Sequence, residues 1–295
     1  MDTPGTTQTS SARPHVDARG AKELVRDFWE SGSCGEHLYL PQTDREGYRA
    51  QAEERYRLEP YIARLAKFGE SQGKRILEIG VGLGADHQRF AEHGAILEGI
   101  DLTERAIAHT RVRLDAFRLT SRLQVADAEA LPFADNQFEV VYSWGVLHHS
   151  PDTPKAFREV LRVLEPGGEA RIMIYHTWSM VGLMLWVRYA LLRGRPWRTL
   201  RSIYAEHLES PGTKAYTRHE TLGLLEGFED IRIEIELTHG DLLESEAGQR
   251  HRGPMLSLAR KIWPRGIIRK LLPNAGLFML IWARKPGHAG AKASR

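Results

Sequence analysis

The chain has 295 residues and a formal net charge of +3, with 42% hydrophobic and 27% charged residues. This composition is ordinary for a soluble protein, and a chain of this length can hold one large domain or a domain with a cap. No uncharged apolar run reaches the roughly 18–20 residues that a membrane-spanning helix needs.

The distribution of charge and the number of cysteines bear on the protein's binding partners and cellular compartment. Residues 247–295 hold eleven Lys or Arg and no acid, whereas residues 1–246 hold 30 basic and 38 acidic side chains. Such a basic segment is either a solvated face or a surface for anionic substrates, phosphate or membrane. Cys34 is the only cysteine, so no intrachain disulfide can form, and no secretory signal is recognisable. We therefore expect a cytoplasmic protein.

The N-terminal region is predicted to change from a tail to helices. Residues 1–20 are polar and aperiodic, which predicts a disordered tail. Residues 21–69 are predicted to form a helical lid in two stretches, the second over residues 46–68. The first stretch places four apolar side chains on one face, namely Leu24, Val25, Phe28 and Trp29.

A glycine-rich turn is the organising feature of the chain. The apolar segment Arg75–Ile79 predicts a buried strand, and Ala85–Glu92 predicts a helix. The intervening residues include Gly80, Gly82 and Gly84. Glycines at this spacing suit a tight strand-to-helix turn in which backbone approaches a ligand closely.

Four further strands are predicted after this turn. The second ends at Asp101, which lies 17 residues beyond Gly84, where doubly wound folds place an acid that accepts ribose hydroxyls. Thr103 then caps a helix. The third strand is predicted to end at residues 127–128 and the fourth near Ser143. A helix and a Pro-Gly-Gly turn lead into the fifth strand, over residues 170–175.

Five motifs in this order carry a family resemblance. They are Glu78-x-Gly80-x-Gly82-x-Gly84, Asp101, VADAEALPF, VVYSWGVLHH and RVLEPGG. The set resembles the class I S-adenosylmethionine-dependent methyltransferases, especially the small-molecule branch with the ubiquinone and menaquinone C-methyltransferases. The resemblance implies an α/β fold with a seven-stranded, doubly wound, Rossmann-like sheet and helices on both faces. In that family the last strand runs antiparallel between the fifth and sixth.

The resemblance also divides the chain. Residues 70–176 would form the cofactor-binding core, and residues 177–226 a substrate-side insert that roofs the pocket in similar proteins. Residues 227–286 would hold the sixth and seventh strands with a basic amphipathic helical segment between them, whose apolar positions begin at Met255. Residues 287–295 are predicted to be a disordered tail.

The resemblance implies a set of cofactor contacts. The backbone of the glycine turn would cradle the amino acid end of S-adenosylmethionine, and Asp101 with Leu102 would bind the ribose. Asp127 and Ala128 would bind the adenine, and the end of the fourth strand would lie beside the methionine portion. Glu78 would orient the loop, bind the cofactor's amino group or serve structure alone. The residues at the end of the fourth strand are Ser143, Trp144 and Gly145.

Histidines follow the fourth strand and extend the candidate site. His148 and His149 could take a proton from the acceptor, or one of them could buttress the loop. No metal-ligand spacing is recognisable, so no metal site is predicted. Candidates for substrate contact are Trp29 and Tyr39 of the lid, for which ordinary packing is an equal alternative, and His176 and Tyr216 of the insert.

The sequence thus predicts in-line methyl transfer from S-adenosylmethionine to an O, N or C atom of a small molecule. The apolar start of the insert, flanked by arginines, favours a hydrophobic, lipid-like or anionic acceptor, and the basic amphipathic segment allows peripheral membrane contact. No nucleic-acid-binding module is evident. Two alternatives remain, a non-catalytic S-adenosylmethionine-binding protein and an NAD(P)-dependent oxidoreductase, whose usual fingerprint is G-x-G-x-x-G. Acceptor identity and oligomeric state are not encoded in these patterns.

Overall fold

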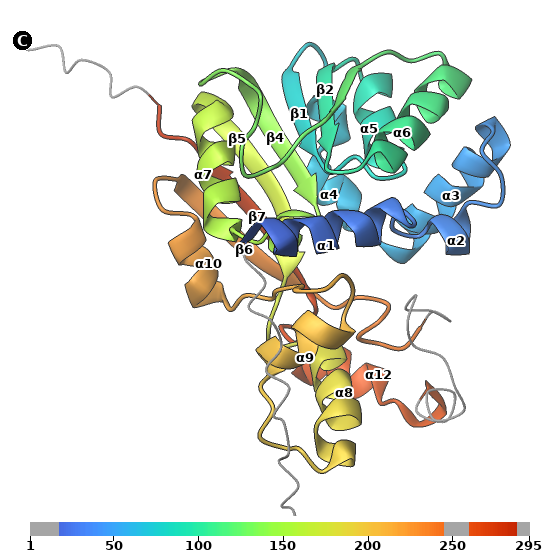
Figure 1. Ribbon diagram of the computed structural model, residues 1–295, viewed down its shortest axis with the longest axis vertical. Helices are drawn as coiled ribbons and strands as arrows, with labels where there is room; N and C mark the ends of the chain where they lie inside the picture. The colour runs from blue at the N-terminus through green and yellow to red at the C-terminus, as the bar shows by residue number, and fades with distance from the viewer. Residues whose placement is uncertain (1–17, 245–259, 288–295) are drawn as a thin grey trace, which may run out of the picture.

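Seven strands form one mixed sheet in the computed structural model, which describes residues 18–244 and 260–287 (Figure 1). The strand order is β3-β2-β1-β4-β5-β7-β6. Strand β7 pairs antiparallel with both β5 and β6, while the pairs among β1 to β5 are parallel. The predicted architecture is therefore confirmed. The strands are β1 (Arg75–Ile79), β2 (Ile96–Asp101), β3 (Arg122–Val125), β4 (Phe138–Trp144), β5 (Leu164–Tyr175), β6 (Glu229–Glu236) and β7 (Phe278–Arg284).

Alternate side chains of the central strands build a separate core on each face of the sheet. Leu77 packs in one cluster with Phe157 of α7, and Ile76 packs in another with Phe90 of α5. Both faces of a doubly wound sheet are buried, which is why β1 is buried continuously from Ile76 to Ile79 rather than at every second residue. The helices that pack around the sheet are α4 (Ile62–Ala66), α5 (Ala85–Glu92), α6 (Glu104–Phe117), α7 (Thr153–Val163) and α10 (Arg218–Leu224).

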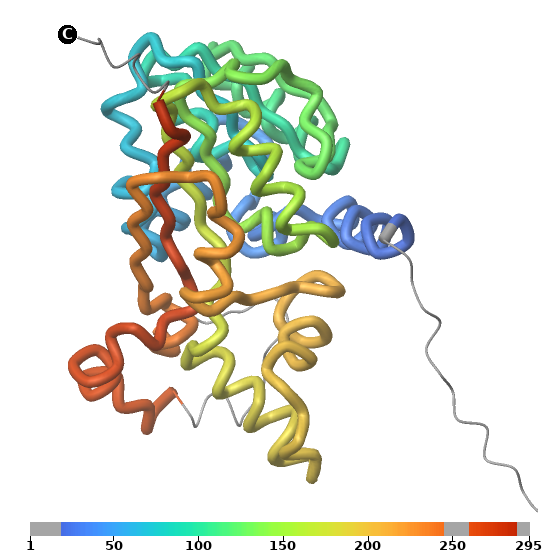
Figure 2. The backbone as a smooth tube through the Cα atoms, turned by 90° about the vertical axis from the view of Figure 1, so that its left-hand side faces the viewer, coloured from blue at the N-terminus to red at the C-terminus, as the bar shows by residue number. Residues whose placement is uncertain are grey.

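A second lobe lies beyond the carboxyl ends of the parallel strands (Figures 1 and 2). It holds α8 (Met180–Tyr189), η3 (Leu191–Arg193), α9 (Leu200–His207) and α12 (Arg265–Leu271). Helix α1 (Ala18–Glu30) crosses at the junction between this lobe and the sheet, and α2 (Glu36–Tyr39) and α3 (Arg45–Leu58) follow it. In the described part of the chain, every helix is too short or too polar to cross a bilayer.

Three predicted boundaries differ from the structure. Strand β3 ends at Val125 because Asp127 starts a turn, accepting bonds from the Glu129 and Ala130 amides. The Pro-Gly-Gly segment lies inside β5 as an irregularity, where the register against β4 shifts. The predicted helical stretch 46–68 is broken near Pro60, which lacks an amide hydrogen.

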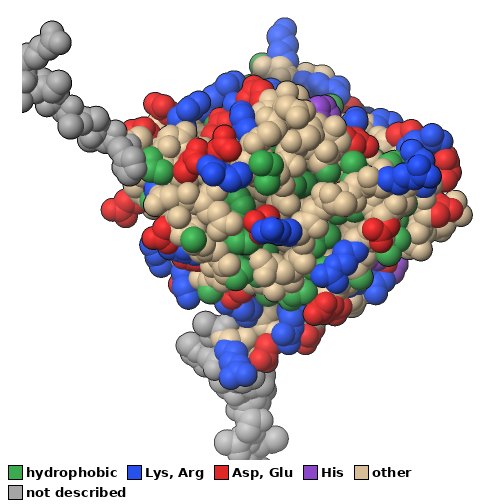
Figure 3. All heavy atoms as spheres, turned by 90° about the horizontal axis from the view of Figure 1, so that it is seen from above, with side chains coloured by type: hydrophobic (Ala, Val, Ile, Leu, Met, Phe, Trp, Pro, Cys, Tyr) green, Lys and Arg blue, Asp and Glu red, His purple; other side chains and the backbone are tan. Residues whose placement is uncertain are grey.

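The basic C-terminal segment is only partly described. Met255 and the rest of residues 245–259 lie outside the described residues, as do most residues of the tails predicted at 1–20 and 287–295; residues 18–20 already belong to α1. In α12, Ile268 is buried but Leu271 is 69% exposed. Seen from the side of the sheet opposite the second lobe, basic and acidic side chains are interspersed (Figure 3).

Candidate functional site

A cavity of about 730 Å³ opens at the carboxyl ends of the parallel strands. In open α/β sheets this edge is the usual place for ligands. Its walls include the N-terminal helices, the glycine turn after β1, the segments that follow β2, β3 and β4, and the insert with α8. The cavity is large enough for a cofactor and a second molecule in contact with it.

The glycine turn has the geometry of a backbone cradle. Gly80 adopts a φ of +84°, and a Cβ added there would lie 2.1 Å from a methyl carbon of Val146. Gly82 also has a positive φ, +52°, but a Cβ there would meet nothing within 4 Å. Gly80 is therefore required for packing, whereas Gly82 keeps space open at the cavity wall. The residues fit a ligand that approaches the backbone at Gly82.

Asp101 fastens this turn from the end of β2. One carboxylate oxygen accepts the Gly82 amide at 3.2 Å, and the other accepts the Thr103 amide at 3.0 Å and hydroxyl at 2.8 Å. Burial raises the pKa of the carboxyl above 3.8, although these hydrogen bonds oppose the shift. The side chain lines the cavity, so its remaining lone pairs can face a ribose.

The lid helix reaches the predicted adenine end. The Lys22 ammonium of α1 bonds to the carboxylates of Asp127 and Glu129. Both Lys22 and Asp127 line the cavity together with Trp29. The lid is thus tied by a salt bridge to the residue that is predicted to bind adenine, which closes the cavity over that end.

Glu78 is bonded to a helix rather than to the glycine turn. Its carboxyl lies 2.8 Å from Nδ1 of His87 in α5, and both side chains are buried. Because the Ser121 hydroxyl donates to the Leu97 carbonyl, His87 Nε2–H donates to Ser121, at 2.8 Å. Nδ1 of the neutral imidazole then accepts a hydrogen bond from the protonated carboxyl of Glu78. Burial accordingly raises the pKa of Glu78 well above 4.5 and lowers that of His87 to about 3.

This assignment predicts unequal effects for two substitutions. Glu78→Gln keeps a donor for His87 and should change the free energy of unfolding by less than about 1 kcal/mol, whereas Glu78→Ala should cost about 1–3 kcal/mol. Urea denaturation would measure both. Equal losses would show that Glu78 is ionised. A tenfold loss of S-adenosylhomocysteine affinity in a stable Glu78→Gln variant would instead assign the carboxylate to the cofactor.

Most of the predicted site residues meet at this cavity, although their roles stay predictions. Four do not line it. Ser143 bonds to the Ile79 carbonyl of β1, His148 is fully buried, and His176 and Tyr216 pair with each other through their backbones. Their predicted ligand contacts are not supported by this placement. The predicted site residues that do line the cavity are Trp29, Tyr39, Glu78, Gly80, Gly82, Gly84, Asp101, Leu102, Asp127, Ala128, Trp144, Gly145 and His149.

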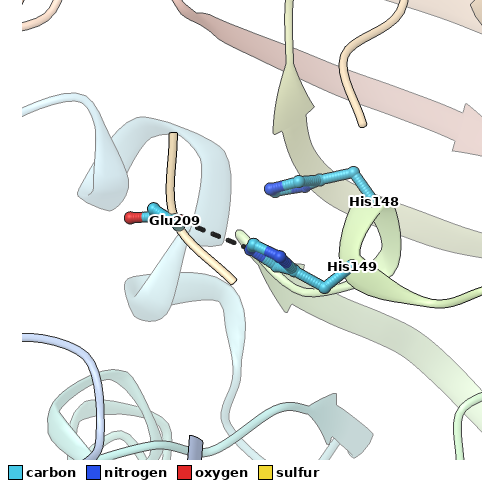
Figure 4. A group of neighbouring side chains, drawn as sticks. All are labelled: His148, His149 and Glu209. Atoms are coloured by element: carbon cyan, nitrogen blue, oxygen red, sulfur yellow. Dashed lines mark ion pairs between the residues drawn. The ribbon is translucent and has the colours of Figure 1, made fainter. Parts of the chain in front are cut away.

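Three cavity residues were missed from the sequence. Arg55 of α3 donates two bonds to the buried carboxylate of Asp86, at 2.7 and 3.2 Å. Glu59 lies four residues after Arg55, about one helical turn along the chain, and burial raises the pKa of its carboxyl to about 7. Glu209 of the insert lies 3.4 Å from Nε2 of His149 (Figure 4). Polar residues scattered on helices have no local signature, and only the fold brings them together.

Comparisons with known proteins indicate a methyltransferase domain. The sequence profile of the family described as "Methyltransferase domain" matches residues 77–172. Phosphoethanolamine N-methyltransferase 2 of Caenorhabditis elegans is 36% identical over 38% of this chain and 26% of its own length. Ubiquinone biosynthesis O-methyltransferase of Coxiella burnetii is 29% identical over 33% of this chain and 42% of its own. The chain thus spans less than half the length of these two relatives.

The fold has a solved counterpart with bound ligands. Phosphoethanolamine N-methyltransferase 2 of Haemonchus contortus, in complex with phosphomonomethylethanolamine and S-adenosylhomocysteine, superposes with a TM-score of 0.56. The match has 21% identity and covers 89% of this chain and 60% of that one. This structural likeness supports the fold alone, whereas the family match over residues 77–172 supports a methyltransferase domain. Residues 77–172 are therefore a methyltransferase domain of the class I S-adenosylmethionine-dependent type, a family in which S-adenosylmethionine is the methyl donor.

Proposed function

We propose that the chain methylates a small molecule with a hydrophobic body. The supporting observation is that one cavity joins the cofactor cradle to an apolar chamber under the insert. Leu102 and Asp127 line the cavity beside the glycine turn, and Trp144, which also lines it, has its ring centroid 5.7 Å from that of Phe278. The chamber end is lined mainly by Val181, Met184, Leu185, Val187, Leu192, Leu243, Trp263, Leu277 and Phe278.

The residues of the chain contribute positioning more than acid–base chemistry. Bound S-adenosylmethionine would supply a methyl group on a sulfonium, whose sulfur leaves as a neutral thioether and needs no proton. The glycine turn and Asp101 fix the cofactor, and the apolar chamber aligns the acceptor with its reacting atom toward Trp144. The lid residues Phe28 and Trp29 line the same cavity and exclude water. Glu59, with a pKa of about 7, can accept a proton from the acceptor at neutral pH.

We expect methyl transfer to depend on the length of the acceptor's apolar chain. With radiolabelled S-adenosylmethionine and a panel of alkyl phenols and fatty acids, kcat/KM should rise with chain length, since each buried methylene contributes about 0.8 kcal/mol. Met184→Lys puts a charge into the chamber and should lower kcat/KM for long acceptors at least tenfold. S-adenosylhomocysteine affinity should stay within about twofold, because the cradle is separate.

A matched lysine outside the cavity is the control. Leu191 of η3 is 48% exposed and does not line the cavity, so Leu191→Lys should leave kcat/KM unchanged. A preference for short polar acceptors would contradict the hydrophobic assignment. Binding of S-adenosylhomocysteine without product from any acceptor would favour a non-catalytic binding protein.

The mouth of the chamber supports delivery of such an acceptor from a membrane surface. Leu192 lines the cavity and is also 62% exposed, and Trp197 nearby in sequence is 75% exposed. Arg188, Arg193 and Arg195 belong to the same segment. Exposed apolar side chains with flanking cations suit an anionic lipid surface. Co-sedimentation with anionic and neutral vesicles distinguishes this contact from an ordinary solvated surface.

A further inference from the structure

Two histidines and a carboxylate converge in one place (Figure 4), and two of the three residues line the cavity. His148 and His149 belong to η2 (Leu147–His149), just after β4, and Glu209 follows α9 in the insert. One potential ligand atom from each residue lies within 4.8 Å of the other two. Both rings project from η2 toward the segment that carries Glu209.

The imidazole of His148 is fully buried without a hydrogen-bond partner for its nitrogens among the described residues. Its contacts are ring packing, with centroids 4.0 Å from Tyr175 and 4.3 Å from His149. Nearly all buried polar groups in folded proteins are satisfied, and an exception calls for a ligand, water or ion.

His149 is held as a ligand would be. Its Nδ1 lies 2.8 Å from the Ser210 hydroxyl and 3.2 Å from the Thr213 hydroxyl, so Nε2 is the atom that faces Glu209. The Tyr175 hydroxyl donates to Glu209 at 2.7 Å and orients that carboxylate. Outer hydrogen bonds of this kind fix metal-binding imidazoles and carboxylates in position.

We propose that His148, His149 and Glu209 bind a divalent transition-metal ion. Two imidazoles and a carboxylate form a donor set that suits Zn²⁺ or Fe²⁺. In a tetrahedral site, metal–ligand bonds of about 2.0–2.2 Å place ligand atoms about 3.3–3.6 Å apart, so the observed spread of up to 4.8 Å has to shorten by about 1.2–1.5 Å through side-chain rotation. The site escapes sequence patterns because Glu209 lies 60 residues beyond His149.

The ion would face the acceptor. His149 and Glu209 both line the cavity, whereas His148 lies behind them. An ion there has open coordination positions on the cavity side, and as a Lewis acid it would favour the deprotonated form of a bound hydroxyl. This role rests on the proposed function, but the binding of the ion does not.

Metal binding can be measured without any acceptor. The untagged chain, stripped with a chelator, is titrated calorimetrically with Zn²⁺, and Co²⁺ is followed by its visible absorption. We expect one ion per chain. Glu209→Gln and His149→Gln should each weaken binding at least tenfold. Two controls should leave it unchanged, Cys34→Ser for the cavity thiol and His219→Gln for an exposed histidine.

Three results would overturn the proposal. They are no Zn²⁺ binding by the wild-type chain, unchanged affinity in both site variants, or loss of binding in Cys34→Ser alone. S-adenosylhomocysteine affinity, measured on the same samples, reports that each variant is folded. Because that affinity does not depend on the ion, a negative metal result leaves the proposed methyl transfer standing.

Discussion

Replacing Asp101 by alanine should weaken S-adenosylhomocysteine binding at least 100-fold. The side chain lines the cavity at the end of β2 and accepts the Gly82 amide, so it both shapes the cradle and faces the predicted ribose position. Hydrogen bonds to a charged group contribute about 1.5–3 kcal/mol each, and two ribose hydroxyls would lose theirs together. Calorimetric titration of the wild type and the variant measures the difference.

Thr103→Val separates the ligand contact from the loop. It removes the hydroxyl that donates to Asp101 and caps α6, but leaves the carboxylate in the cavity. We expect a loss of about 1 kcal/mol in stability and less than fivefold in affinity. An Asp101→Ala affinity within threefold of wild type would remove Asp101 from the site, and tighter binding of NADH would revive the oxidoreductase alternative.

The parts of the site that depend on local spacing were predictable. Gly80, Gly82 and Asp101 lie where they were expected because a strand, a turn and a helix follow one another along the chain. The N-cap of α6 is also confirmed, since the Thr103 hydroxyl accepts the Ala106 amide. In such units, short-range sequence decides the conformation, and the fold only has to place the unit at the sheet edge.

The parts that depend on distant contacts were not predictable. Lys22 and Asp127 are 105 residues apart, and Glu209 meets His149 only because the insert folds back over β4. Glu78 carries a motif position, yet its partner His87 is on the helix that packs against β1, and burial of the pair rather than the motif decides that it is protonated. The order of residues along the chain does not show which side chains the fold will bury.

Asp86 is expected to be the most important polar side chain for stability. It is 3% exposed in α5 and accepts bonds from three side chains at 2.7–3.2 Å, those of Arg55, Tyr56 and Tyr142. Asp86→Ala leaves the Arg55 charge and two hydroxyls without this partner and should cost about 3–5 kcal/mol. Urea denaturation measures the loss. Asp115→Ala, an exposed acid on α6, should change stability by less than about 0.5 kcal/mol.

The pH dependence of this loss identifies its cause. Burial alone would raise the pKa of Asp86, but the Arg55 charge and the three donors outweigh it and hold the pKa below 3.8. A carboxyl whose folded pKa is depressed contributes its full stability above the unfolded pKa of about 3.9 and loses it as the pH falls through the folded value. The gap between wild type and Asp86→Asn should therefore be constant from pH 5 to 7 and narrow below about pH 4. A stability difference that persisted below pH 4 would mean that packing, rather than the charge of the Asp86 carboxylate, holds α3 against α5.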